Sequence, residues 1–138
     1  MGRVIGIDYG TKRVGLAVTD PLQIIASPLD TVRAHLILDY LKQYCQDEET
    51  DAFVVGMPLN LNNTATDATN HVKGFVKRLR KHFPEKEIFL QDERFTSKEA
   101  LDAMIKGGTS KKYRREKGNI DKVSATIILQ SYLEKYQT

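Results

Sequence analysis

Residues 3–19, which read RVIGIDYGTKRVGLAVT, decide the fold of this chain. The apolar runs at 3–9 and 13–19 flank the short segment Gly10-Thr11-Lys12, and this pattern predicts two strands joined by a tight hairpin. A third short strand is predicted over roughly 23–28, where it ends near a proline. We therefore expect the chain to begin with three consecutive strands.

Beyond these strands, apolar residues recur alternately at helical spacing and in short continuous runs. The patterns predict a helix at 34–46, a strand at 51–57, a helix opening at the capping box 64–67, a strand at 88–90, a helix that opens at 96–99 and ends at Gly107-Gly108, and a last helix from about 120 to 136. This order predicts an α/β fold, with a mixed five-stranded sheet and helices on both faces. The length of 138 residues suits a single domain, 1–138.

Each predicted helix has a stripe of apolar residues that we expect to face the core. The stripes comprise Leu36, Leu38, Leu41 and Tyr44 in the first helix, Ala68, Val72, Phe75, Val76, Leu79 and Phe83 in the second, and Val123, Ile127, Ile128 and Tyr132 in the last. In the second helix, basic residues take the other side, namely Lys73, Lys77, Arg80 and Lys81.

The composition is that of an ordinary soluble globular protein, with 41% hydrophobic and 28% charged residues. The single cysteine, Cys45, excludes a disulfide within the chain, so a reducing compartment is the simplest interpretation. An acidic residue, Asp8, comes too early for a signal peptide, and no apolar run approaches the ~20 residues that span a bilayer. We expect a cytoplasmic protein with no membrane partner.

The net charge of +3 conceals an uneven distribution. Residues 1–70 carry a net charge of −4, whereas residues 71–118 carry +7. A loop is predicted at 109–118, and its cations include Lys111, Lys112, Arg114 and Arg115. Such a basic half favours a positive surface that binds a polyanion, although lysine-rich solvated helix faces would give the same count.

Asp8 is the first candidate for chemistry. It lies inside an apolar strand, where a carboxylate is costly to desolvate unless it is paired or binds a cation. One interpretation is a carboxylate that caps the following glycine turn. The other is a metal ligand that projects from a rigid strand.

Asp92, Glu93 and Arg94 close the strand predicted at 88–90. Neighbouring residues of a strand point to opposite faces, so one carboxylate joins a shared site more easily than both. We favour Glu93, with Asp92 as the alternative. Arg94 is either a phosphate clamp or the partner of these acids in a strand-end ion pair.

Asp121 is predicted in the first turn of the last helix, where an acid interacts favourably with the helix dipole by ~0.3–1 kcal/mol without any further role. Three carboxylates from separate elements, Asp8, Glu93 and Asp121, could instead hold one or two Mg²⁺ ions, with Mn²⁺ as a substitute. No histidine–cysteine cluster suggests zinc, and the histidines are predicted on the surface, at His35, His71 and His82. The phosphate-loop pattern is also incomplete.

Several segments together resemble the YqgF/RuvX family of ribonuclease H-like proteins. They read GIDYGTKRVGLA at 6–17, VGMPLN at 55–60, DERFTS at 92–97 and DKVSA at 121–125. Each segment is short, but they follow the family's order over nearly the whole chain. Asn63 and Ser124 depart from the residues common there, which are glycine and alanine.

The resemblance implies the fold of the Holliday-junction resolvase RuvC, with Asp8, Glu93 and Asp121 at the catalytic, metal-binding positions. It also implies a nuclease that matures the 5′ end of pre-16S ribosomal RNA, or one that acts on branched DNA. We expect structured RNA or branched DNA as substrate, ribosomal precursor particles as partners, and a monomer or weak homodimer. The expected substrate-binding residues are Lys12, Arg13, Arg94, Lys111, Lys112, Arg114, Arg115 and Lys122.

Two other classes of function compete with the nuclease. The Asp8-x-Gly10-Thr11 segment also resembles the first phosphate loop of actin-like and sugar-kinase-like ATPases, but those proteins need two such domains. A non-catalytic RNA-binding factor for ribosome assembly would require the basic surface alone.

Overall fold

The computed structural model describes residues 2–58, 67–92 and 117–136. Residues 64–66 of the first predicted capping box, the second capping box, the helix predicted up to Gly107-Gly108 and most of the basic loop lie outside these residues. So do six predicted site residues, Glu93, Arg94, Lys111, Lys112, Arg114 and Arg115.

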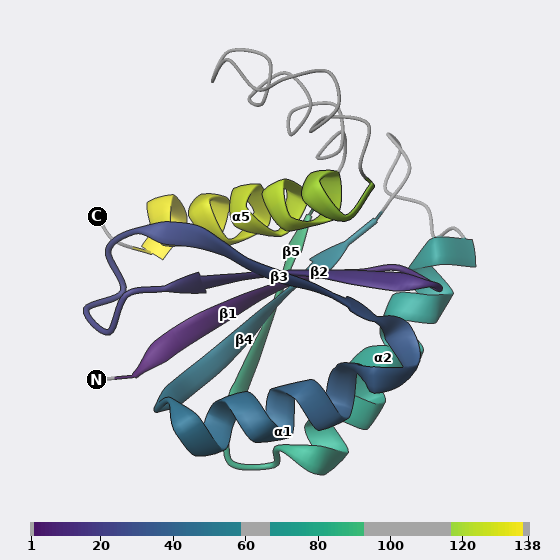
Figure 1. The fold of residues 1–138 in the computed structure, drawn as a ribbon, viewed down its shortest axis with the longest axis horizontal. Coiled ribbons are helices and arrows are strands. Elements are labelled where there is room, and N and C mark those ends of the chain that lie inside the picture. The colour runs from purple at the N-terminus through teal and green to yellow at the C-terminus, as the bar shows by residue number, and fades with distance from the viewer. Residues whose placement is uncertain (1, 59–66, 93–116, 137–138) are drawn as a thin grey trace.

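A mixed five-stranded sheet forms the centre of the molecule (Figure 1). Its strands are β1 (Arg3–Tyr9), β2 (Arg13–Thr19), β3 (Ala26–Arg33), β4 (Thr50–Met57) and β5 (Glu87–Asp92), in the order β3-β2-β1-β4-β5. The hairpin partners β1, β2 and β3 pair antiparallel, whereas β4 is parallel to both β1 and β5. The predicted mixed sheet is therefore confirmed.

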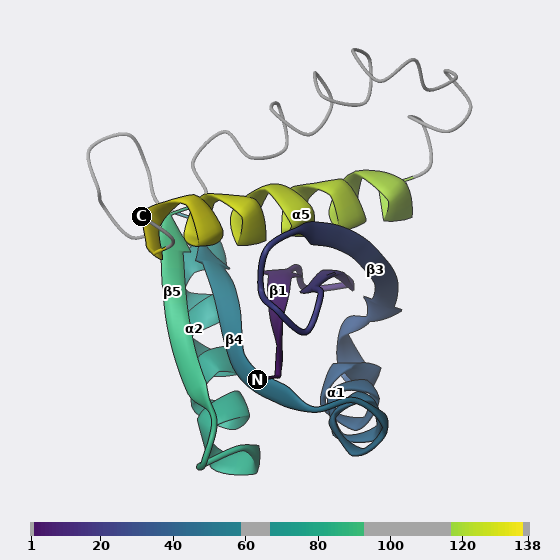
Figure 2. The same ribbon diagram turned by 90° about the vertical axis from the view of Figure 1, so that its left-hand side faces the viewer.

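Helices cover both faces of this sheet (Figure 2). A short 3₁₀ turn η1 (Ala34–Leu36) leads into α1 (Ile37–Asp47), and α2 (Asp67–His82) lies on the same face. The long helix α5 (Lys117–Tyr136) covers the other face. No helix in the described part of the chain is long and apolar enough to cross a membrane.

The alternation of side chains along β1 divides the core in two. Ile5 and Ile7 pack with α1 and α2, in a cluster that includes Phe53 and Phe75. Val4 packs on the opposite side, in a cluster with Leu129 of α5. The even-numbered residues of β1 therefore face α5, which fixes the side of the sheet on which Asp8 lies.

The third strand differs from the prediction of 23–28, because β3 spans Ala26–Arg33. A turn occupies the residues before it, where the Asp20 carboxylate accepts the backbone N–H groups of Ile24 and Ile25 at 2.8 Å each. Gln23 is left-handed there, with φ 58°. The proline, Pro28, does not end the strand, because β3 is an edge strand with a register shift at that point, where a missing N–H is tolerated.

The predicted apolar stripes are confirmed in part. Val72, Phe75, Val76, Leu79 and Phe83 of α2 and the segment after it are buried. Ala68 is exposed, and Thr69 takes the inward position, where its hydroxyl donates to the carbonyl of Pro58. Leu36 is 46% exposed, because η1 turns it outward and Ile37 enters the core instead.

The inner face of α5 also differs from the prediction. Ile128 is buried as expected, but Val123 and Ile127 are half-buried. The residues that pack fully are Ser124, Ala125, Ile128, Leu129 and Leu133. The small residues Ser124 and Ala125 lie near the part of this helix that packs directly against Gly6 and Gly15 of the sheet.

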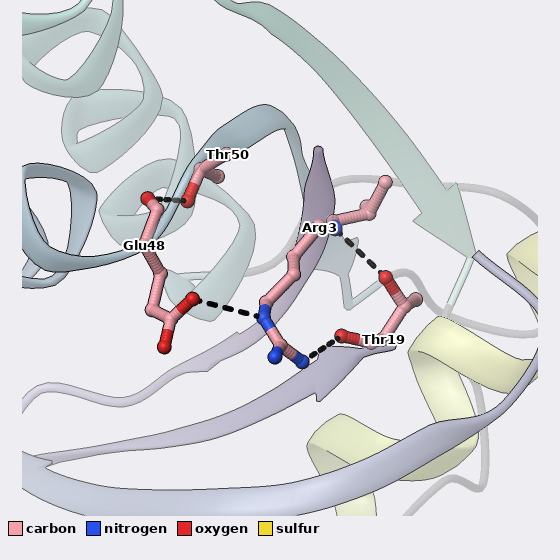
Figure 3. Close-up of polar contacts among 5 residues, drawn as sticks. Arg3, Thr19, Glu48 and Thr50 are labelled. Atoms are coloured by element: carbon pink, nitrogen blue, oxygen red, sulfur yellow. Dashed lines mark hydrogen bonds and ion pairs between the residues drawn. The ribbon is translucent and has the colours of Figure 1, made fainter. Parts of the chain in front are cut away.

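A polar network joins the start of β1, the end of β2 and the residues before β4 (Figure 3). The guanidinium of Arg3 forms an ion pair with Glu48 at 3.5 Å and donates to the carbonyl of Thr19 at 3.0 Å. The Thr19 hydroxyl accepts the backbone N–H of Val4 at 2.9 Å. These contacts join the start of β1 to the end of β2 and to the residues before β4.

Candidate active site

Asp8 lies near the carboxyl end of β1, on the face that α5 covers. It pairs across the hairpin with Gly15 of β2, and directly opposed residues of an antiparallel pair project to the same face. Asp8 is therefore half-buried near the carboxyl end of the central strand, on the side opposite the α1/α2 core. This is the position that a ligand on a rigid strand requires.

The start of α5 lies directly against Gly15. A Cβ atom placed on that glycine would lie 2.0 Å from the backbone oxygen of Asp121, a distance that no real contact allows. Gly6 has the same role further along, where a Cβ would lie 2.7 Å from the Cβ of Leu129. Two glycines thus let the helix approach the sheet closely, and Asp8 and Asp121 both adjoin Gly15.

Asp121 is held by an ion pair with Arg13. The Nε of Arg13 donates to a carboxylate oxygen of Asp121 at 2.9 Å, and both side chains are partly exposed. Arg13 and Gly15 lie two residues apart on β2 and therefore face α5 together. Arg13, predicted to bind substrate, here also positions a predicted metal ligand.

Asp121 is not in the first turn of its helix, as the sequence pattern predicted. The helix begins at Lys117, three residues earlier than expected, so Asp121 lies in the second turn. The residues 117–118, predicted as part of the basic loop, are helical. Since the dipole effect falls off within the first turn, it explains this carboxylate less well than the prediction assumed.

The end of β5 bears on the choice between Asp92 and Glu93. Asp92 pairs with Met57, which packs in the α1/α2 core, so Asp92 projects to the face opposite Asp8. Phe89 projects to the α5 face, where its ring lies 5.2 Å from that of Tyr132. Asp92 is therefore poorly placed to share a site with Asp8.

Two other basic residues that were predicted to bind substrate, Lys12 and Lys122, also belong to the described residues. Lys12 is exposed in the hairpin turn, and its carbonyl accepts the N–H of Ala34 at 2.9 Å. Lys122 follows Asp121 and is half-buried. Arg33, which the sequence pattern did not single out, is the cross-strand neighbour of Arg13 and is exposed.

The donor set suits a hard cation. Asp8 and Asp121 supply carboxylate oxygens on one face of the sheet, and such oxygens are the ligands that Mg²⁺ and Mn²⁺ prefer. Within residues 2–58, 67–92 and 117–136, no three carboxylate, histidine or cysteine side chains gather as a metal site. Two of the three predicted ligands are thus on the same face, while Glu93 lies outside the described residues.

Comparisons with known proteins agree with this architecture. The structure of Thermus thermophilus RuvC in complex with a Holliday junction substrate superposes with a TM-score of 0.60, at 16% identity, over 98% of this chain and 96% of that one. A second structure, described as "Thermus thermophilus RuvC structure", gives a TM-score of 0.56 at 16% identity, over 99% of this chain and 97% of that one. At this identity the likeness establishes the fold.

The relatives by sequence are much closer. A protein of Amoebophilus asiaticus named "Putative pre-16S rRNA nuclease" is 52% identical over 137 residues, which cover 99% of this chain and 97% of that protein. One of Flavobacterium johnsoniae with the same name is 46% identical over 133 residues, 96% of each chain. A family model described as "RuvX: Holliday junction resolvase" matches residues 2–135.

The sheet order, the helices on both faces and the RuvC likeness define a protein of the ribonuclease H-like fold. Within that class, the chain belongs to the RuvX family. The resemblance found in the sequence segments is thereby confirmed.

Proposed function

We propose that this chain is a divalent-metal-dependent nuclease that hydrolyses phosphodiester bonds during 5′-end processing of pre-16S ribosomal RNA. The observation that carries the proposal is the placement of Asp8 and Asp121 on one face of the sheet, both beside Gly15. The names of the close relatives support the same substrate. This function would place the protein in the cytoplasm, as a monomer or weak homodimer that contacts ribosomal precursor particles.

In this proposal Asp8, Glu93 and Asp121 hold Mg²⁺, for which Mn²⁺ can substitute. When bound, the metal activates a water molecule and stabilises the leaving oxygen of the phosphodiester. Glu93 is preferred over Asp92, since Asp92 projects to the other face of the sheet. Arg13 orients the carboxylate of Asp121 through their 2.9 Å ion pair.

The cations around this edge would bind the phosphate backbone on either side of the cleaved bond. Of these cations, Arg13 pairs with Asp121, Lys122 follows Asp121 in α5, and Lys12 precedes Arg13 in the hairpin turn. Arg94, Lys111, Lys112, Arg114 and Arg115 complete the proposed contact set. Such contacts fix the register of a nucleic acid without reading its sequence.

The test is cleavage of end-labelled pre-16S RNA fragments and of a four-way DNA junction, each with Mg²⁺ or EDTA. We expect the wild-type protein to cut the RNA with Mg²⁺. Asp8→Asn should lower the cleavage rate by about 100-fold or more, because an amide NH₂ group replaces one carboxylate oxygen and the negative charge that binds Mg²⁺ is lost. Asp39→Asn, an exposed change on α1, is the control and should leave the rate unchanged. Cutting by Asp8→Asn at the wild-type rate would refute the assignment.

A DNA junction resolvase is the second candidate, because the matching family model is described by that activity. Cutting of the junction in preference to the RNA would favour it. Binding of both substrates without cutting would favour the non-catalytic assembly factor instead. In that case the Arg13–Asp121 pair would serve the structure alone.

A further inference from the structure

A cavity on the α1/α2 face lies beside the same edge of the sheet as the candidate active site. Its volume is about 320 Å³, and its lining residues are Tyr9, Thr11, Ala34, His35, Ile37, Leu38 and Arg78. Tyr9 follows Asp8 directly in β1, so the two side chains project to opposite faces of one strand end. The hairpin turn that carries Thr11 and Lys12 connects the two sides.

Arg78 supplies the positive charge of this cavity. Its side chain runs back along α2 over Gly74, where a Cβ would lie 3.8 Å from its Nη1, and its Nη2 donates to the Tyr9 hydroxyl at 3.1 Å. In the described ranges, no carboxylate lies within 4.0 Å of this guanidinium. Lys12, which follows the lining residue Thr11 in the hairpin turn, is exposed.

The remaining walls suit a planar, partly apolar group. Tyr9 stacks on Phe75, with ring centroids 4.4 Å apart and an interplanar angle of 10°, so its ring is held in place. Ile37 and Leu38 give an aliphatic wall, while Thr11 and His35 add hydrogen-bonding groups. An aromatic ring, an aliphatic wall and a guanidinium that has no carboxylate partner among the described residues are the elements that bind a base and its phosphate.

We propose that this cavity binds one unpaired nucleotide of the nucleic acid substrate, with its base against Tyr9 and Leu38 and its phosphate at Arg78. The proposal rests on the proposed function, since it assumes that the strand bound at Asp8 continues over the hairpin turn. A volume of about 320 Å³ accommodates a single nucleotide but no base pair. The cavity therefore selects substrates with a single-stranded segment next to the cleavage point.

The test compares binding of a fluorescent hexaribonucleotide with binding of the same sequence as a duplex, by anisotropy in EDTA. We expect Arg78→Met to weaken hexamer binding about tenfold and duplex binding less than twofold, because a charge-assisted contact is lost from the single strand alone. Arg80→Met is the matched control, on the same helix and exposed but outside this cavity, and should change neither. Equal losses for the two variants, or equal losses for the two ligands, would overturn the proposal.

A second variant tests whether binding needs the space inside the cavity, independently of the charge of Arg78. Ala34→Leu fills part of the cavity without changing charge, and it should reduce hexamer binding while its melting temperature stays near that of the wild type. Unchanged hexamer binding by folded Ala34→Leu would also overturn the proposal. The binding titration contains EDTA and therefore measures binding without cleavage. Asp8→Asn should keep the preference for the single-stranded hexamer in this titration. The nuclease assignment is tested separately, by the cleavage assay with Mg²⁺.

Discussion

Among single residues, Arg13 and Asp121 form an ion pair within the candidate site, with Arg13 Nε 2.9 Å from a carboxylate oxygen of Asp121. An ion pair between partly exposed groups contributes about 0–1 kcal/mol to folding, so stability does not explain its position beside Asp8. A carboxylate bound to a guanidinium is oriented, but one of its oxygens is shared with that cation. In the proposed metal site, the pair would therefore both position Asp121 and compete with a metal ion for its carboxylate.

This competition gives a prediction for metal affinity. Arg13→Met should bind Mn²⁺ about two- to fivefold more tightly than the wild type, because a nearby positive charge and a competing donor are removed. It should bind RNA more weakly, through loss of a phosphate contact. Titration calorimetry with Mn²⁺, and anisotropy with RNA, would measure the two effects.

Arg33→Met is the control for that experiment. Arg33 is the cross-strand neighbour of Arg13 but has no ion pair with Asp121 within the described residues. It should leave Mn²⁺ affinity nearly unchanged. If Arg13→Met bound Mn²⁺ no better than Arg33→Met, the ion pair would not be competing with the metal.

At the scale of elements, the site depends on how closely α5 lies against the hairpin. Gly15→Ala places a methyl group where the backbone of Asp121 already lies, so the helix must move or the strand must bend. We expect a loss of about 1–3 kcal/mol in the free energy of unfolding, as overpacking typically costs. Chemical denaturation measures this directly, and cleavage should fall with it because Asp121 is displaced.

Gly74→Ala is the matched control, with the opposite sign. A Cβ there meets the end of the flexible Arg78 side chain at 3.8 Å, an ordinary contact, and the residue lies inside α2. The change should stabilise the protein by about 0.5–1 kcal/mol, since alanine is the better helix former. A stable Gly15→Ala protein would contradict the close packing of α5.

The sequence predicted most elements but not this contact. Apolar runs such as 3–9 and 13–19 carry their own periodicity, so β1 and β2 are confirmed to the residue. The register shift in β3 and the early start of α5 depend on tertiary contacts, which no local pattern records. Isolated glycines inside apolar strands, Gly6 and Gly15, were the available signal, because a strand glycine often marks a close backbone approach.

The candidate site was predictable to a similar extent. Asp8 could be selected as an acid inside an apolar strand, and Asp121 by the other carboxylates and the family resemblance. The structure brings both to Gly15. The ion pair of Arg13 with Asp121 spans 108 residues of sequence and had no local signature. The cavity at Tyr9 and Arg78 likewise joins a strand end to the middle of a helix.

At the scale of the whole molecule, the described residues have opposite charges at the two ends of the parallel strands. The carboxyl end, with Asp8, carries Lys12, Arg13, Arg33, Arg78 and Lys122. At the amino end, acidic residues outnumber the cations Arg3 and Lys86; the acids are Glu48, Glu49, Asp51, Glu85 and Glu87. This arrangement would attract a polyanion to the carboxyl ends of the parallel strands and repel it from their amino ends.

This polarity predicts which lysines contribute to RNA binding. Lys12→Gln should weaken binding several-fold at low salt and lower the slope of log Kobs against log salt concentration by about 1, because one phosphate contact and its released counterion are lost. Lys86→Gln removes the same charge at the amino end, where the Lys86 ammonium group donates to the Thr50 carbonyl at 2.7 Å. It should leave the slope unchanged. Equal slopes for the two variants would show that RNA binds through overall charge rather than through this edge.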